Sequence, residues 1–134
     1  LKNTPKFPFG YGLSYTKFEY SNLKLSSSKI KESEKITLSF QLKNTGKVAG
    51  EEVVQLYLQD KFASVVRPVK ELKDFQKVKL QPGESKIVTF VIDKEKLSFY
   101  NQKLDWIYES GEFEVMIGTS SADIRLKDLF ELIN

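Results

Sequence analysis

The 134-residue sequence contains no cysteine and no histidine. The first absence excludes disulfides and thiolate chemistry, so cysteine usage does not indicate a redox compartment. The second absence removes the commonest general base and zinc ligand, and with them any Ser-His-Asp triad. No Asn-x-Ser/Thr sequon is present either. The composition therefore points away from several common catalytic and metal centres.

Long apolar runs are also missing. No stretch approaches the roughly 18 residues of a membrane span, and no apolar h-region of a signal peptide is visible, so we expect no membrane partner. The chain begins at Leu1, and we expect it to be part of a longer polypeptide. The net charge is only +3, without an arginine cluster interleaved with aromatics, so no nucleic-acid partner is predicted.

Glycine-rich and acidic motifs that hold cofactors or metals are weak here. Gly10 and Gly12 approach a phosphate-binding loop, but the third glycine is absent and a strand pattern follows where a helix is needed. Asp60 and Asp93 lie outside any Asp-x-Asp-x-Asp-Gly calcium loop. The sequence predicts no cofactor and no metal site.

Glu51 and Glu52 are the only adjacent acidic pair. Paired carboxylates can serve as acid and base, but neighbours on a strand point to opposite faces and cannot converge on one bond. We interpret one as a solvated residue and the other as a turn residue.

Period-two alternation of apolar and polar residues dominates the chain from residue 17 onward. KITLSFQLKNTG places Ile36, Leu38, Phe40 and Leu42 on one face, which predicts a half-buried strand. EVVQLYLQD and GEFEVMIG repeat the pattern, with Tyr57 turned outward. SKIVTFVID is apolar at nearly every position, which predicts a more central strand.

Irregularities and turns punctuate these strands. The parity of the apolar residues changes near Asn22, which predicts a β-bulge, and a similar slip falls between Leu72 and Phe75. QPGE at 81–84 suits a type II turn, because proline presets the second position and glycine allows a positive φ at the third. We predict an all-β chain, an antiparallel sandwich of about seven strands over residues 17–134.

The first sixteen residues have a different character. KFPFGYGLSY combines four aromatic side chains with two glycines and a proline. This stretch is too apolar for a solvated connection and too interrupted for a helix. We interpret residues 1–16 as an aromatic docking linker that lies against another surface.

Four motifs in order carry a family resemblance. FPFGYGLSYTKFEY resembles the segment that leads into the C-terminal fibronectin type III-like domain of glycoside hydrolase family 3, the β-glucosidases and β-xylosidases. VAGEEVVQLYLQD, VVRPVKELKDFQKVKLQPGES and SGEFEVMIGTSSADIRL are similar to three further motifs of that domain. The resemblance covers residues 7–126. It departs at Asp74, where the family often has glycine, so we expect strain at the bend after Lys73.

The resemblance implies both a fold and a role. It implies an immunoglobulin-like (fibronectin type III-like) sandwich that acts as a non-catalytic accessory domain, stabilising or orienting the catalytic domains of a β-glucosidase-type hydrolase. In such enzymes the nucleophilic aspartate and the acid/base glutamate belong to upstream domains, so no catalytic residue is assigned in this sequence. The resemblance favours a secreted or periplasmic location over a cytoplasmic one.

Two segments match motifs of that domain and carry the hypotheses about contact with the catalytic body. The linker residues predicted to dock there are Phe7, Phe9, Gly10, Tyr11, Gly12, Leu13 and Tyr15. Arg67 and Pro68 match the loop motif, and we expect Arg67 to pair with a local carboxylate. The alternative, which rests on loop placement in the family, is that the loop Lys61–Arg67 reaches toward the substrate cleft.

Two other functions remain open on the sequence. The chain could be a carbohydrate-binding module that holds polysaccharide, with Trp106 as a sugar platform. On a strand, however, Trp106 shares a face with Leu104 and Tyr108, which is typical of a core or a domain contact. A stand-alone adhesive module is the third possibility, and the aromatic linker argues against it.

Overall fold

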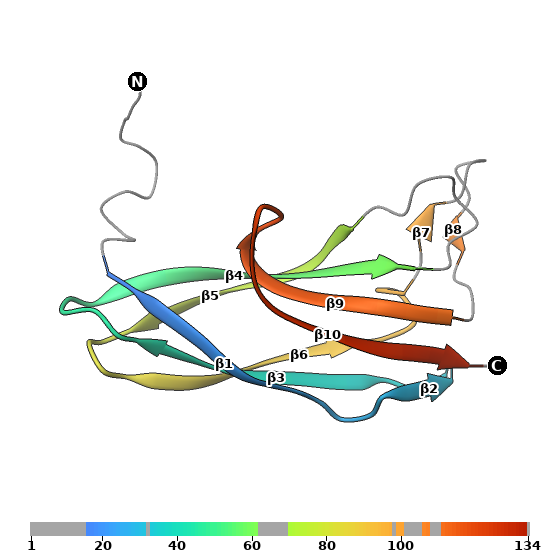
Figure 1. Cartoon of the computed structure of the whole chain (residues 1–134), viewed down its shortest axis with the longest axis horizontal. Helices are drawn as coiled ribbons and strands as arrows, with labels where there is room; N and C mark the ends of the chain where they lie inside the picture. The colour runs from blue at the N-terminus through green and yellow to red at the C-terminus, as the bar shows by residue number, and fades with distance from the viewer. Residues whose placement is uncertain are drawn as a thin grey trace, which may run out of the picture.

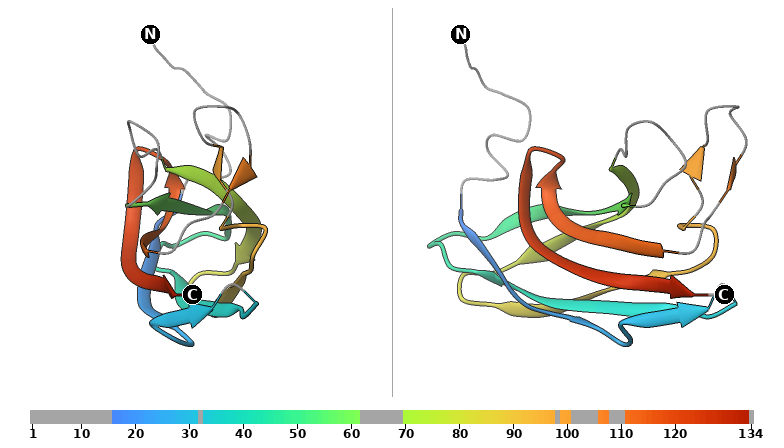
Figure 2. Two further views of the ribbon diagram at one scale, coloured as in Figure 1. Left: turned by 90° about the vertical axis from the view of Figure 1, so that its right-hand side faces the viewer. Right: turned by 45° about the vertical axis from the view of Figure 1, so that its right-hand side comes forward.

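The computed structural model describes residues 16–31, 33–61, 70–97 and 111–133, and the backbone of two short strands at 99–100 and 106–107. In this part of the chain, seven strands of at least eight residues form two sheets, as predicted. Figures 1 and 2 show these sheets as two stacked layers. Among the described residues, no helix is long and apolar enough to cross a membrane.

The two sheets differ in size. The smaller has the order β1-β3-β6, with β1 (Phe18–Leu25), β3 (Ile36–Asn44) and β6 (Ser85–Ile92). The larger has the order β2-β10-β9-β4-β5, with β2 (Lys29–Lys31), β10 (Asp123–Ile133), β9 (Gly111–Ser120), β4 (Gly50–Asp60) and β5 (Glu71–Leu80). β7 (Phe99–Tyr100) and β8 (Trp106–Ile107) pair with each other at the end of the sandwich that also holds the C-terminus (Figure 1).

The core lies between the layers and follows the predicted alternation. Phe40 of β3 is 1% exposed, and its ring stacks on Tyr20 of β1 with the centroids 5.6 Å apart. Phe113 of β9 and Phe130 of β10 are also stacked, at 5.4 Å. Each large apolar side chain removed from water in this way stabilises the fold by roughly 1.5–3 kcal/mol.

Both predicted irregularities are present as breaks in strand register. β1 shifts against β3 between Ser21 and Lys24, and Asn22 takes up the extra residue with φ 57°. Asparagine tolerates this left-handed backbone better than most residues do. β5 shifts against β4 at Lys73, because Leu72 pairs with Tyr57 whereas the next pair is Asp74 with Leu56.

The turn at 81–84 is also confirmed. Gly83 has φ 80°, and the amide of Glu84 donates to the carbonyl of Gln81 at 3.0 Å. The expected strain at Asp74 is wrong, because Asn22 is the only non-glycine residue with a positive φ in the described part of the chain. The bulge at Lys73 absorbs the slip instead, and the Asp74 carboxylate accepts a hydrogen bond from the amide of Phe75 at 2.8 Å.

β6 is an edge strand, and the prediction of a more central strand is wrong. It pairs only with β3 within its sheet. Val88, Phe90 and Ile92 are buried in the core, while Ile87 and Val91 face outward and are 62% and 40% exposed. An uninterrupted apolar run therefore does not prove that both faces of a strand are covered.

Candidate functional site

The point where the chain enters the sandwich is fixed by one buried side chain, Asn44 at the end of β3. We call Thr16 and Lys17, which precede β1, the root of the linker. The Asn44 oxygen Oδ1 accepts from the Thr16 hydroxyl at 2.8 Å and from the Gly46 amide at 2.9 Å. Its Nδ2 donates to the carbonyls of Val48 (2.9 Å) and Leu80 (3.1 Å). Both donors and both acceptor positions of this fully buried amide are thus in use.

The turn after β3 packs tightly against the root. The amide of Thr45 donates to the carbonyl of Lys17 at 2.8 Å. A Cβ placed on Gly46 would lie 1.7 Å from Oγ1 of Thr16 and 2.9 Å from the backbone nitrogen of Lys17. Glycine at position 46 is therefore required by close approach, and Thr16 and Lys17 are held tightly against this turn.

A polar hollow of about 460 Å³ opens beside the root. Its walls come from the root, from β1, from the start of β4 and from the β9–β10 hairpin: Thr16, Lys17, Phe18, Glu52, Thr119, Asp123 and Arg125. Segments that lie far apart in the sequence thus meet at one end of the sandwich.

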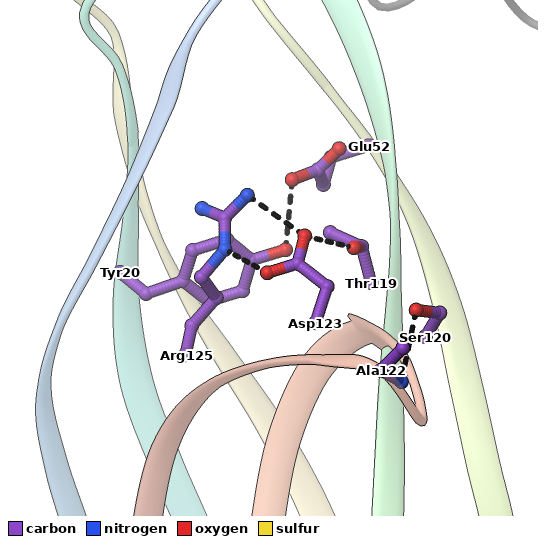
Figure 3. Close-up of polar contacts among 7 residues, drawn as sticks. All are labelled: Tyr20, Glu52, Thr119, Ser120, Ala122, Asp123 and Arg125. Atoms are coloured by element: carbon purple, nitrogen blue, oxygen red, sulfur yellow. Dashed lines mark hydrogen bonds and ion pairs between the residues drawn. The ribbon is translucent and has the colours of Figure 1, made fainter.

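Glu52 is the most buried acidic side chain of this hollow, at 8% exposed. The Tyr20 hydroxyl donates to its Oε2 at 2.8 Å (Figure 3). Burial raises the pKa of Glu52, while the hydrogen bond from Tyr20 and the charge of Arg125 oppose that rise. Burial also raises the pKa of Tyr20, and the adjacent Glu52 charge adds to this effect. The phenol is therefore held as a donor.

Asp123 and Arg125 form the other half of the cluster. Nε and Nη2 of Arg125 donate to the two carboxylate oxygens of Asp123 at 2.8 and 3.0 Å, and the Thr119 hydroxyl donates to Oδ2 at 2.6 Å. These hydrogen bonds, that of Arg125 first, lower the pKa of Asp123 to about 2. The guanidinium carbon lies 5.2 Å from the centre of the Tyr20 ring, a cation–π contact that joins the two halves (Figure 3).

This arrangement is suited to holding chain segments together. Both oxygens of Asp123 already accept hydrogen bonds from Arg125 and Thr119, and Glu52 accepts one from Tyr20. A general base needs a carboxylate oxygen within reach of a substrate proton. In the described ranges, no three acidic side chains converge to hold a metal ion.

The residues predicted to act in function fall mostly outside the part of the chain that the structure describes. These are the docking residues Phe7, Phe9, Gly10, Tyr11, Gly12, Leu13 and Tyr15 and the loop residues Arg67 and Pro68. The backbone of Trp106 pairs with Tyr100 in the β7–β8 hairpin, but its side chain is outside the described residues. All of these assignments stay predictions.

The cluster itself was not predicted from the sequence. Glu52 was interpreted as a solvated or turn residue, and it is a buried strand residue bonded to Tyr20. A signal was present for part of the cluster: in SADIRL, Asp123 and Arg125 are two residues apart, a spacing that places both on one face of a strand. The partners Tyr20 and Glu52 lie in distant segments, and only the fold brings them there.

Comparison with known proteins identifies the domain type. The sequence profile of the fibronectin type III-like domain matches residues 52–121. Thermostable beta-glucosidase B of Acetivibrio thermocellus is 54% identical over 125 residues, which cover 92% of this chain and 17% of that protein. A putative beta-xylosidase of Formosa agariphila is 51% identical, over 98% of this chain and 17% of its own length.

Solved structures agree with these relatives. A mutant beta-glucosidase from Listeria innocua in complex with laminaribiose is 45% identical with a TM-score of 0.78, and the match covers 100% of this chain and 18% of that one. The chain thus spans less than a fifth of the hydrolases that it matches. It belongs to the family of fibronectin type III-like domains, in the form carried by the β-glucosidases and β-xylosidases of glycoside hydrolase family 3.

Proposed function

We propose that this chain is the non-catalytic accessory domain of a family 3 glycoside hydrolase that acts on β-linked glucosides or xylosides, and that it stabilises or orients the catalytic domains. The observation that carries the proposal is the length relationship: the chain matches β-glucosidases at 54% and 51% identity over nearly all of its own length but only 17% and 18% of theirs. The rest of such a polypeptide has room for the catalytic machinery.

The root of the linker supports an orienting role. Asn44 and Gly46 fix Thr16 and Lys17 to the turn after β3, so the point at which the linker joins the sandwich is held by specific contacts. A domain attached at a rigid root transmits its orientation, whereas a flexible tether does not. In this proposal the aromatic residues of the linker, from Phe7 to Tyr15, dock on the catalytic body and extend that rigid connection.

The polar cluster supports a structural role for its carboxylates. Glu52 and Asp123 hold Tyr20, Thr119 and Arg125 in place around the root. These contacts join β1, β4 and the β9–β10 hairpin. In the same proposal, the loop with Arg67 and Pro68 approaches the substrate cleft of the catalytic body.

The test compares three proteins: the complete hydrolase polypeptide, the same polypeptide cut before Thr16, and this chain alone. With an aryl β-glucoside and an aryl β-xyloside as substrates, this chain alone should show no turnover. The truncated hydrolase should lose thermal stability and activity relative to the complete polypeptide. Cleavage by this chain alone, or a truncated enzyme as stable and active as the complete one, would contradict the proposal.

A matched pair of linker variants separates docking from simple connection. Phe7→Ser with Phe9→Ser in the complete hydrolase should lower its melting temperature if the linker docks, because apolar contact area is lost. Lys2→Ser with Lys6→Ser, two polar positions of the same linker, should leave it unchanged. Equal melting temperatures for both pairs would show that the linker only tethers.

A further inference from the structure

The outer face of the five-stranded sheet, which points away from the three-stranded sheet, is not an ordinary solvated surface. β4 has three consecutive buried residues, Leu56, Tyr57 and Leu58. Successive side chains of a strand point to opposite faces, so Tyr57 lies on the outer face although it is only 8% exposed. Its register partner on β9, Met116, lies on the same face and is 3% exposed. Core-like side chains therefore occupy both faces of the sheet at this point.

Exposed apolar residues of β5 and β4 continue this surface toward the edge of the sheet. Leu72 is the register partner of Tyr57 and is 48% exposed. Phe75, the partner of Gln55, is 56% exposed, and Val53 on β4 is 37% exposed. We call Val53, Leu72 and Phe75 the apolar strip. A phenylalanine that leaves more than half of its surface in water, beside two aliphatic neighbours, is typical of an interaction surface.

The outer face of the three-stranded sheet offers a contrast within the same molecule. Its residues on β3 are small or polar, and they pair in register with those of β6: Thr37 with Val91, Ser39 with Thr89 and Gln41 with Ile87. Ile87 and Val91 are exposed there, but Thr89 lies between them on the same face. Single exposed aliphatic residues in a polar setting are normal for a protein surface. This face therefore supplies matched controls.

The position of the strip indicates what covers it. Val53 directly follows Glu52 on β4, so it lies at the end of the sheet where Glu52 lines the hollow from the other face. Leu72 stands at the opposite end, at the start of β5, directly after the connection from β4 that carries the predicted cleft loop. The strip thus runs between the two points at which the segments assigned to the catalytic body leave the sandwich. The hydrolases that this chain matches contain more than four-fifths of their length outside this domain.

We infer that the remainder of the same hydrolase polypeptide packs on the apolar strip. The inference rests on the proposed function and adds the face of contact. At the border of the strip, Lys77 is exposed on the same face as its register partner Val53, while the next lysine, Lys79, lies opposite the acidic Glu51. The partner surface is therefore apolar at its centre, with a carboxylate where it meets Lys77.

Hydroxyl-radical footprinting read by mass spectrometry measures the exposure of these side chains directly. The experiment compares this chain alone with the complete hydrolase polypeptide, and Ile87 serves as the internal control. Phe75 and Leu72 should be oxidised in the chain alone and several-fold less in the complete polypeptide. Ile87 should be oxidised equally in both. Equal oxidation of Phe75 in the two proteins would overturn the inference.

Paired substitutions in the complete polypeptide give a second measurement. Leu72→Ser with Phe75→Ser should lower its melting temperature by several degrees, and Ile87→Ser with Val91→Ser should leave it nearly unchanged. If removal of the whole domain destabilises the hydrolase while the two paired variants have the same melting temperature, the proposed function stands and the inference is wrong.

Two other occupants are distinguished in the same samples. A second copy would appear as concentration-dependent protection of Phe75 in the chain alone, together with a dimer in sedimentation that the Leu72→Ser/Phe75→Ser pair abolishes. Polysaccharide would appear as protection of Phe75 by a soluble β-glucan. Either result, combined with unchanged oxidation in the complete polypeptide, overturns the inference.

Discussion

The core of the sandwich and the root of the linker are both buried, but different forces hold them. In the core, Phe40, Phe90 and Phe113 belong to a continuous apolar cluster drawn from both sheets. At the root, a single amide, Asn44, makes four hydrogen bonds. Apolar burial is roughly proportional to area and is shared over many residues, whereas a buried polar network depends on every partner being present. Substitutions in the core should therefore lower the stability of the domain in proportion to the side-chain volume removed. Substitutions at the root should lower it according to how many hydrogen-bond partners are lost.

Phe40→Ala should give the largest effect. Phe40 is 1% exposed and stacks on Tyr20, so its removal leaves a cavity between the sheets. We expect the free energy of unfolding to fall by about 3–5 kcal/mol in urea denaturation. The control is Thr37→Ala, an exposed outward position of the same strand, which should change it by about 0.5 kcal/mol or less. A loss for Phe40→Ala no larger than that of the control would show that the core does not depend on this ring.

Asn44→Ala should give the next largest loss in the free energy of unfolding. The substitution removes the side chain that bonds the carbonyls of Val48 and Leu80 and the amide of Gly46. Asn44 is fully buried, so water does not reach these groups easily. Unsatisfied buried groups predict a loss of about 2–4 kcal/mol in the same assay. Thr45→Ala is the neighbouring control, because its exposed hydroxyl donates a long hydrogen bond, 3.4 Å, to the carbonyl of Lys17. Equal losses for the two variants would mean that water replaces the amide and that the root is not a specific network.

Gly46→Ala tests close approach against backbone conformation. Its Cβ would meet Thr16 and Lys17 of the root, so we expect a loss of about 1–3 kcal/mol from overpacking. Gly83→Ala is the matched comparison: nothing lies within 4 Å of its Cβ, but φ is +80°, so the loss of about 1 kcal/mol should come from the backbone alone. Additional substitution of Thr16 by alanine should recover part of the loss for Gly46→Ala and none for Gly83→Ala.

The same contrast explains how much could be predicted from the sequence. Alternation is a local signal, so the strand around Phe40, the bulge at Asn22 and the turn at Gly83 were all predicted correctly. The position of β6 was not, because Ile87 and Val91 make the strand look buried on both faces while alternation does not say how many neighbours a strand has.

The polar sites could not be predicted in the same way, because their partners are far apart in the sequence. Thr16 and Asn44 are 28 residues apart, and Tyr20 and Glu52 are 32 apart. No short-range pattern links such positions, and only the fold brings Tyr20 of β1 and Arg125 of β10 to the hollow that Glu52 lines. Glu51 and Glu52 face opposite ways, as their adjacent positions on a strand predict, but alternation alone does not show which of them faces inward.

The pH dependence of stability should give the smallest effect and separates the two halves of the cluster. Burial raises the pKa of Glu52, so the folded chain keeps this proton to a higher pH than the unfolded chain does. Between the ordinary value of 4.5 and the raised value, the folded state binds more protons, and the contribution of Glu52 to stability falls as pH rises. Asp123, with its pKa lowered to about 2, contributes stability that is lost only as the pH falls below its ordinary value of 3.8.

Glu52→Gln isolates the contribution of Glu52 to the change of stability with pH. Glutamine keeps the shape and can accept from Tyr20 but has no proton to lose, so the stability of the variant relative to the native chain should rise with pH from 4.5 upward and then level off. Tyr20→Phe removes a hydrogen bond that lowers the pKa of Glu52, so the pKa of this carboxyl should rise further. The fall in stability with rising pH should then continue to a higher pH than in the native chain. Urea denaturation between pH 4.5 and 8 measures both. A difference between Glu52→Gln and the native chain that does not vary with pH would show that the carboxyl is solvated, and that the root is held by Asn44 without help from a buried charge.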